Sequence, residues 1–227
     1  MPAVLIADEL LIPAWVETLA DFRRWTSSDD FPENGRVDYI RGQIEVDMSP
    51  ERLFSHGLVK SAIAESVLLQ NREANLGHVY IDRARMVSVP ADLSCEPDVC
   101  LISWDSLQTG RVRYLPAPRA SDPLDLLEIE GGPDLVVEIV SPSSVAKDTR
   151  RLPSAYFAAG VLELWLVDAR GEDIKFTIHR RGRIAFKPVA TDKDGFQRSA
   201  VLGRAFRLSR KPGPLAGTVV YQLETRP

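Results

Sequence analysis

The chain has 227 residues, of which 44% are hydrophobic, and its formal net charge at pH 7 is −4. This hydrophobic content is enough for one well-packed domain, and the slightly acidic balance excludes a basic protein that wraps nucleic acid over its whole surface. The N-terminus lacks the basic region and long apolar core of a signal peptide, and no apolar run approaches the roughly 20 residues that span a bilayer. We therefore expect a cytoplasmic protein with no membrane partner.

The cysteines and histidines do not form a metal-binding pattern. Cys95 and Cys100 lie on one predicted strand, and their odd spacing points them to opposite faces. We interpret both as small core residues of a protein in a reducing compartment. His56, His78 and His179 are far apart in the sequence and do not match an HExxH zinc motif.

The first part of the chain predicts a helical arm followed by strands and a long helix. Apolar residues recur at helical spacing over 13–25, within an N-terminal helical arm at 1–30, and we expect residues 31–227 to form a single domain. Gly42 permits a tight turn between two short strands. The predicted elements here are a helix at 13–25, strands at 37–40 and 44–48, a helix from 53 to about 71, and strands at 79–81 and 85–89.

The second part predicts a strand–helix–strand unit after a long loop. Residues 108–133 lack periodicity and are rich in proline and glycine, which is typical of a loop. A strand at 135–140, a helix at 149–159 and a strand at 164–168 have the order and length of a βαβ crossover. Further strands are predicted at 174–179, 184–189 and 219–223. The whole pattern favours an α/β fold of the mixed α+β kind, with a mixed central β-sheet flanked by helices.

Two acidic residues interrupt otherwise apolar strands. Glu138 lies within a run of β-branched residues, and Asp98 follows Pro97 at the beginning of another buried run. A carboxylate in a buried strand costs several kcal/mol unless a metal, an arginine or a proton pairs with it. If the two strands are neighbours, the carboxylates could together bind Mg²⁺, which prefers oxygen ligands and can activate a water for attack on a phosphodiester.

Several ordered segments carry a resemblance to a known family. They are Asp38 to Ile44, Met48-Ser49-Pro50 with His56, Glu96-Pro97-Asp98, Asp134 to Ser144, Lys147-Asp148, and Tyr156 to Asp168. Together, over most of residues 31–190, they resemble the Uma two-type endonucleases of the PD-(D/E)XK nuclease superfamily. The resemblance implies a restriction-endonuclease-like core and a hydrolase that uses Mg²⁺ or Mn²⁺ to cleave phosphodiester bonds in DNA.

The resemblance also implies a set of site residues. Asp98 matches the metal-binding aspartate, Glu138 matches the second metal ligand, and the carbonyl of Ile139 is a third metal ligand. His56 is a candidate catalytic residue on the first core helix, and a satisfied histidine on the helix surface is the alternative. Glu65 on the same helix is a weaker candidate for a contact to a metal-bound water.

The usual lysine of this superfamily is missing from both of its expected positions, which hold Val140 and Leu152. Lys147 is the lysine of this segment, and we interpret it as a relocated catalytic residue at the helix start. A solvated surface charge is the alternative for this lysine. Arg150 and Arg151 are poorer substitutes because an arginine essentially never deprotonates.

Three functional hypotheses follow. The first is a Mg²⁺-dependent DNA endonuclease that uses Asp98, Glu138 and Lys147, and analogy with the superfamily predicts a homodimer. The second is a catalytically degenerate nuclease-fold protein that acts as a nucleic-acid-binding or scaffold module. The third assigns both carboxylates a purely structural role, paired with arginines in a protein dimer.

Overall fold

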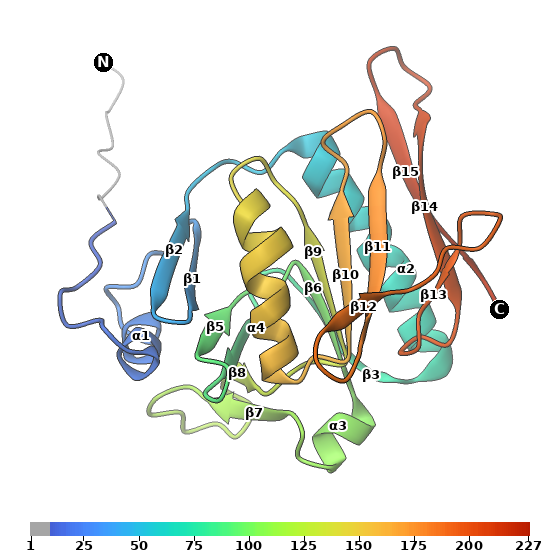
Figure 1. The fold of residues 1–227 in the computed structure, drawn as a ribbon. Helices are drawn as coiled ribbons and strands as arrows, with labels where there is room; N and C mark the ends of the chain where they lie inside the picture. The colour runs from blue at the N-terminus through green and yellow to red at the C-terminus, as the bar shows by residue number, and fades with distance from the viewer. Residues whose placement is uncertain (1–9) are drawn as a thin grey trace, which may run out of the picture.

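The computed structural model describes residues 10–227, which form two six-stranded sheets, one three-stranded sheet and the helices around them (Figure 1). Residues 1–9 of the predicted N-terminal arm lie outside this part. The rest of the arm contains α1 (Leu19–Thr26), whose apolar side packs against the first sheet through Phe22 and Trp25. The division of the chain at residue 30 stays a prediction.

The first sheet has the strand order β2-β1-β5-β4-β8-β7. Its hairpin turns at Arg41-Gly42 as predicted, with both residues at positive φ. The prediction that residues 108–133 form a loop is wrong, because this segment contributes β7 and β8. Proline is tolerated at Pro116 because β7 is an edge strand. The strands are β1 (Arg36–Ile40), β2 (Gln43–Asp47), β4 (Arg85–Ser88), β5 (Leu93–Cys95), β7 (Arg113–Pro116) and β8 (Leu126–Glu130).

The second sheet carries the predicted βαβ unit and has the order β12-β11-β10-β9-β6-β3. Strands β9 and β10 are parallel and joined through α4, whereas β6 pairs with β9 in the antiparallel sense. The sheet is therefore mixed, as predicted. Its strands are β3 (Gly77–Ile81), β6 (Val99–Ser103), β9 (Leu135–Ile139), β10 (Glu163–Asp168), β11 (Lys175–Arg181) and β12 (Phe186–Pro188).

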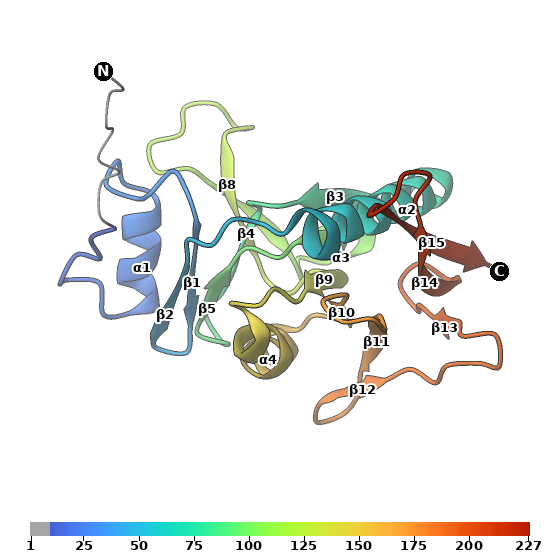
Figure 2. The same ribbon diagram turned by 90° about the horizontal axis from the view of Figure 1, so that it is seen from above.

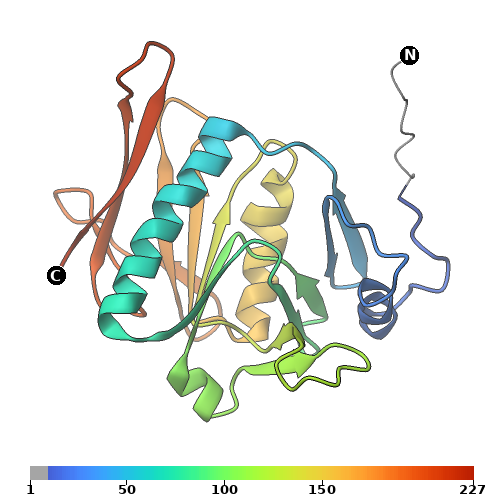
Figure 3. The ribbon, with the colours of Figure 1, turned by 180° about the vertical axis from the view of Figure 1, so that it is seen from behind.

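Helices cover both faces of the second sheet. Seen from above, α2 lies on one side of β9 and β10 and α4 lies on the other, and the view from behind shows α2 crossing the sheet (Figures 2 and 3). The remaining strands, β13 (Gln197–Arg198), β14 (Ala205–Pro212) and β15 (Val219–Arg226), form the third sheet beside α2. The other helical elements are the π-helical turn η1 (Leu53–Leu58), α2 (Val59–Ala74), α3 (Trp104–Gln108), the π-helical turn η2 (Lys147–Arg151) and α4 (Leu152–Ala159).

The first helix begins later than the sequence predicted. The Thr18 side chain accepts a hydrogen bond from the backbone N–H of Asp21, and the Asp21 carboxylate accepts one from the backbone N–H of Thr18, each at 3.2 Å. This capping box satisfies two of the free N–H groups at the helix start. The helix therefore starts at Leu19 rather than at Pro13.

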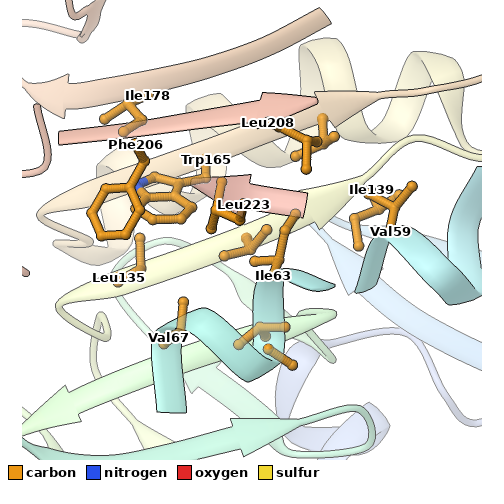
Figure 4. Close-up of a cluster of buried hydrophobic side chains, with 14 of the residues drawn as sticks. Val59, Ile63, Val67, Leu135, Ile139, Trp165, Ile178, Phe206, Leu208 and Leu223 are labelled. Atoms are coloured by element: carbon orange, nitrogen blue, oxygen red, sulfur yellow. The ribbon is translucent and has the colours of Figure 1, made fainter. Parts of the chain in front are cut away.

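The side chains of β9 divide between two cores. Leu135, Val137 and Ile139 face α2 and belong to the cluster drawn in Figure 4. Val136 faces the opposite way and packs with residues of α4. Because side chains alternate along a strand, Glu138 points to the α4 side. The sequence of β9 thus fills one core and places a carboxylate on the other face of the same sheet.

Both cysteines are buried, as predicted, but they do not share a strand. Glu96, Pro97 and Asp98 separate β5, which holds Cys95, from β6, which holds Cys100, and both side chains lie in the core on the α4 side of the second sheet. The prediction that they face opposite sides of one strand is therefore wrong. Within residues 10–227, none of the helices combines the length and the apolar character needed to cross a bilayer.

The variant Ile63→Ala tests how much the packing of α2 on the second sheet contributes to stability. The Ile63 side chain is fully buried, so we expect Ile63→Ala to lower the free energy of unfolding by about 2–5 kcal/mol, through lost burial and the cavity left behind. Leu69→Ala on the exposed side of the same helix is the matched control, with an expected change within about 0.5 kcal/mol. Urea denaturation measures both, and equal losses in the two variants would contradict the assignment of the buried face.

Candidate active site

The two predicted carboxylates, Asp98 and Glu138, lie opposite each other just beyond the point where the pairing of β6 with β9 ends. The last paired residues are Val99 and Val137, so the register continued by one residue sets Asp98 against Glu138. The backbone N–H of Ile139 donates to Asp98 Oδ2 at 2.7 Å, which ties the two strand ends together. Both carboxylates are buried. The structure therefore brings together the three residues that the sequence predicted as metal ligands.

Asp98 is held in its charged form by two basic side chains. Arg36 donates to Asp98 Oδ1 at 2.8 Å, and His56 Nε2 lies 3.5 Å from Asp98 Oδ2. Burial alone raises the pKa of Asp98, but the hydrogen bonding and charge of His56 and Arg36 outweigh burial and lower it below its usual range. The two basic partners therefore favour the ionised form of Asp98.

Glu138 has the opposite electrostatics. The hydroxyl of Tyr156 donates to Glu138 Oε1, while Oε2 has no hydrogen-bond partner among the described residues. Burial, and then the charges of Asp98 and Asp148, raise the pKa of Glu138 well above its ordinary value. Glu138 therefore either keeps a proton or, when ionised, needs a further cation beside its free oxygen.

Lys147 lies in the buried part of the site, with only 5% of its surface exposed. Its ammonium donates to Asp38 Oδ2 at 2.8 Å. Burial lowers the pKa of Lys147, but the charges of Asp38 and Glu138 outweigh burial and raise it. Lys147 is therefore not a solvated surface charge, and its catalytic role stays a prediction.

His56 is also a buried and partnered side chain rather than a histidine on the helix surface. Its Nδ1 lies 2.5 Å from Glu51 Oε1, and its other ring nitrogen faces Asp98. Burial lowers the pKa of His56, but hydrogen bonding to Asp98 and Glu51 outweighs burial and raises it. The π-helical turn η1 places this ring between the carboxylates of Glu51 and Asp98.

Four further residues of the site were missed or given no role by the sequence reasoning. Asp38 satisfies the criterion that selected Glu138, an acidic residue inside an apolar strand, so that signal was present. Asp148 is part of the resemblance but has no role assigned to it there, and burial raises its pKa to about 6, helped by the nearby charge of Asp98. Local pattern does not predict the contacts of Arg36 with Asp98 or of Tyr156 with Glu138, because both depend on the tertiary fold.

A cleft of about 420 Å³ opens above the carboxylates. Asp98 and Glu138 are almost wholly buried and do not line the cleft themselves, whereas Arg36, His56 and Lys147 do. The other lining residues are Gly35, Asp47, Ser49 to Arg52, Lys60, Asp82, Arg83, Glu96 and Ser141 to Ser144.

The remaining positions named from the sequence lie away from this cluster. Val140 and Leu152 are buried apolar side chains, so neither expected lysine position supplies a cation. Arg150 and Arg151 are exposed, and Arg151 pairs with a glutamate of β2. Glu65 is exposed on α2 and is not part of the cleft lining. Of these sequence-named basic candidates, Lys147 lines the cleft.

The donor set fits a hard divalent cation with few protein ligands. Within residues 10–227, no group of three or more His, Cys, Asp and Glu side chains is placed to hold a metal ion. The site offers two carboxylates and the Ile139 carbonyl, and Mg²⁺ commonly takes one or two carboxylates and keeps several waters. The unpartnered Oε2 of Glu138 supports this fit. So does the presence of four buried carboxylates, on Asp38, Asp98, Glu138 and Asp148.

The raised pKa of Glu138 predicts a pH-dependent gain in stability for Glu138→Gln. In the wild type, the folded state keeps a proton that the unfolded carboxyl releases above about pH 4.3, so wild-type stability falls as the pH rises through the folded pKa. Glutamine carries no such proton. In EDTA, we expect Glu138→Gln to unfold at higher urea than the wild type at pH 8, with a smaller difference at pH 5. A gain that grows toward low pH would contradict this assignment, and the exposed Glu172→Gln is the control.

The buried pair of Lys147 and Asp38 predicts a large loss of stability in Lys147→Met. The change removes the ion-pair partner of the buried Asp38, which keeps only the backbone N–H of Glu96 among the described residues, and should cost about 3–5 kcal/mol of unfolding free energy. Arg151→Met removes a similar contact, 2.7 Å from Glu45, but Arg151 is 41% exposed and the loss should stay below about 1 kcal/mol. Urea denaturation of both variants, and of Lys147→Met with Asp38→Asn, measures the coupling. The assignment fails if the double variant is no more stable than Lys147→Met.

Comparison with known proteins agrees with the resemblance found in the sequence. The family model described as "Uma2: Putative restriction endonuclease" matches residues 19–210. A solved structure from Anabaena variabilis ATCC 29413, described as "a putative nuclease belonging to DUF820", superposes with a TM-score of 0.58 and 18% sequence identity, covering 82% of this chain and 90% of that chain. At this identity it shows a shared fold, and no curated protein matches. Because the family model spans most of its length, the chain belongs to the Uma2 family.

Proposed function

We propose that the protein is a divalent-metal-dependent endonuclease that hydrolyses phosphodiester bonds in DNA. The observation that carries the proposal is the opposed pair of buried carboxylates, Asp98 and Glu138, with one oxygen of Glu138 left without a partner. A protein does not bury two facing carboxylates without a compensating cation or proton. The membership of a family described as restriction endonucleases supports the class of reaction.

Asp98, Glu138 and the carbonyl of Ile139 are the groups that would hold Mg²⁺ or Mn²⁺. The bound ion would polarise the phosphodiester and lower the pKa of an attacking water. Glu138 is suited to this position because its Oε2 has no hydrogen-bond partner among the described residues, and Asp98 is suited because its lowered pKa favours the ionised form.

Lys147 would stabilise the negative charge that develops on the phosphate. Its pKa is raised, so the ammonium stays protonated and cannot serve as a general base at neutral pH. It lines the cleft and is fixed by Asp38, which keeps it in one position before the substrate binds. His56 would position Asp98 through its ring and add positive charge at the cleft wall.

The cleft supports an anionic polymer as substrate, despite the net negative charge of the chain. Several basic side chains line it, and phosphate contacts from such groups fix a nucleic acid in register. The basic side chains that carry this argument are Arg36, Arg52, His56, Lys60 and Lys147. A homodimer with two such sites would suit cleavage of both strands of a duplex, and both the dimer and the cytoplasmic location stay predictions.

A second candidate is a nuclease-fold protein that binds nucleic acid without cleaving it. The specific observation in its favour is the Arg36 guanidinium on Asp98, which supplies a cation from the protein itself. The apolar residues at Val140 and Leu152 also favour it.

Nicking of supercoiled plasmid in Mg²⁺ or Mn²⁺ distinguishes the two candidates. We expect cleavage by the wild type, and a loss of about 10²-fold or more in Asp98→Ala and Glu138→Ala, because each removes a ligand of the metal. Glu172→Ala, in an exposed turn before β11, should cleave at the wild-type rate.

The opposite result is equally informative. If the wild type cuts none of several DNA substrates with either metal, yet binds DNA in a calorimeter, the binding module is the correct function. Undiminished cleavage by Asp98→Ala would place the chemistry elsewhere in the protein.

A further inference from the structure

We infer that Arg36 lowers the affinity of the metal site, because its guanidinium is a resident cation that a divalent ion must displace from Asp98. The inference rests on the proposed function, since it needs a metal site at Asp98 and Glu138. It assigns Arg36 a positioning role within that site and no part in the chemistry.

Both oxygens of Asp98 are already occupied. Oδ2 accepts the backbone N–H of Ile139 at 2.7 Å, and Oδ1 accepts Arg36 Nη2 at 2.8 Å. The backbone contact is part of the connection between β6 and β9 and cannot move without opening the sheet. A divalent ion bound at about 2.1 Å from Oδ1 would meet the guanidinium at the same oxygen. Since the two positive charges repel, the ion and Arg36 compete for Asp98.

Arg36 faces the whole acidic cluster rather than Asp98 alone. Burial lowers the pKa of Arg36, but the charges of Asp98, Glu138 and Asp38 outweigh burial and raise it. The guanidinium therefore neutralises the carboxylates that a metal would otherwise neutralise. Its presence allows the site to stay folded without a metal, at the cost of weaker metal binding.

The structure also offers Arg36 another carboxylate. Its Nη2 lies 3.7 Å from Asp82 Oδ1, which is on the cleft side and 40% exposed. The Arg36 side chain is itself 23% exposed and lines the cleft. A short movement toward Asp82 would therefore release Asp98 without burying an unpaired charge. Asp82 already accepts Lys60 at 2.9 Å and can share its two oxygens between both cations.

Calorimetric titration of Mn²⁺ into the metal-stripped full chain tests this inference. We expect Arg36→Met to bind Mn²⁺ about tenfold or more tightly than the wild type, because the competing cation is gone. Arg83→Met removes the same charge from the same cleft but has no contact with Asp98, so it should bind Mn²⁺ with wild-type affinity. Asp98→Asn should lose binding.

Asp82→Asn tests the displacement itself. We expect this variant to bind Mn²⁺ several-fold more weakly than the wild type, because Arg36 loses the carboxylate to which it moves. The same change made in the Arg36→Met background should have little effect. Equal weakening in both backgrounds would show that Asp82 acts only through its own charge, and the displacement would be wrong.

Stability gives a second readout that does not depend on activity. Without metal, Arg36→Met should melt below the wild type, and saturating Mn²⁺ should raise its Tm by more than it raises that of the wild type. Arg36→Lys keeps a positive charge and should bind Mn²⁺ with an affinity between those of the wild type and Arg36→Met. This variant replaces Arg36→Met in the titration if Arg36→Met does not fold.

The outcomes separate this inference from the proposed function. If Arg36→Met binds Mn²⁺ no more tightly than the wild type while Asp98→Asn abolishes binding, the metal site stands and the role of Arg36 is wrong. If neither the wild type nor Arg36→Met binds Mn²⁺ and no plasmid is cut, the metal site and the proposed function both fail.

Discussion

The burial of two facing carboxylates at the ends of β6 and β9 is the constraint on which the site depends. Asp98 and Glu138 would repel each other strongly in a low-dielectric interior. Each surrounding element contributes a cation or a hydrogen-bond donor that offsets part of this repulsion. Strand β1 brings Arg36, the π-helical turn η2 brings Lys147, and α4 brings the hydroxyl of Tyr156. The N-terminal hairpin and the crossover helix are thus held against the second sheet by charge as well as by apolar packing.

The alternation of β9 makes this arrangement compatible with a stable core. One face of the strand contributes Leu135, Val137 and Ile139 to the apolar cluster around Trp165 and α2. The other face carries Glu138 and packs against α4. Because apolar burial and charge occupy different faces of one strand, the sheet keeps its packing while the α4 side carries an unfavourable cluster of carboxylates. Stability sacrificed at such a cluster is common at functional sites.

The sequence predicted those parts of the molecule that depend on local pattern. The βαβ unit, the hairpin at Gly42 and the acidic residues inside apolar strands all follow from periodicity or composition over a few residues. The partners of those acidic residues cannot be predicted from local pattern, because Arg36 and Asp98 lie 62 residues apart in the sequence and Lys147 and Asp38 lie 109 residues apart. Such pairs are set by strand order. The division into two six-stranded sheets, and strands β7 and β8 in the proline-rich segment, escaped local reasoning for the same reason.

The position of Lys147 has a physical explanation in the π-helical turn η2. The resemblance implies a lysine at Val140 or, as in many members of the family, at Leu152, which here packs in the core on the α4 side. The backbone N–H of Leu152 donates to the carbonyl of Lys147, an i→i+5 bond that sets these two residues one above the other. An α-helical turn would rotate Lys147 away from Leu152, whereas the wider turn keeps both on the buried side. The lysine can therefore move one turn earlier in the sequence and still reach the acidic cluster, where Asp38 fixes it.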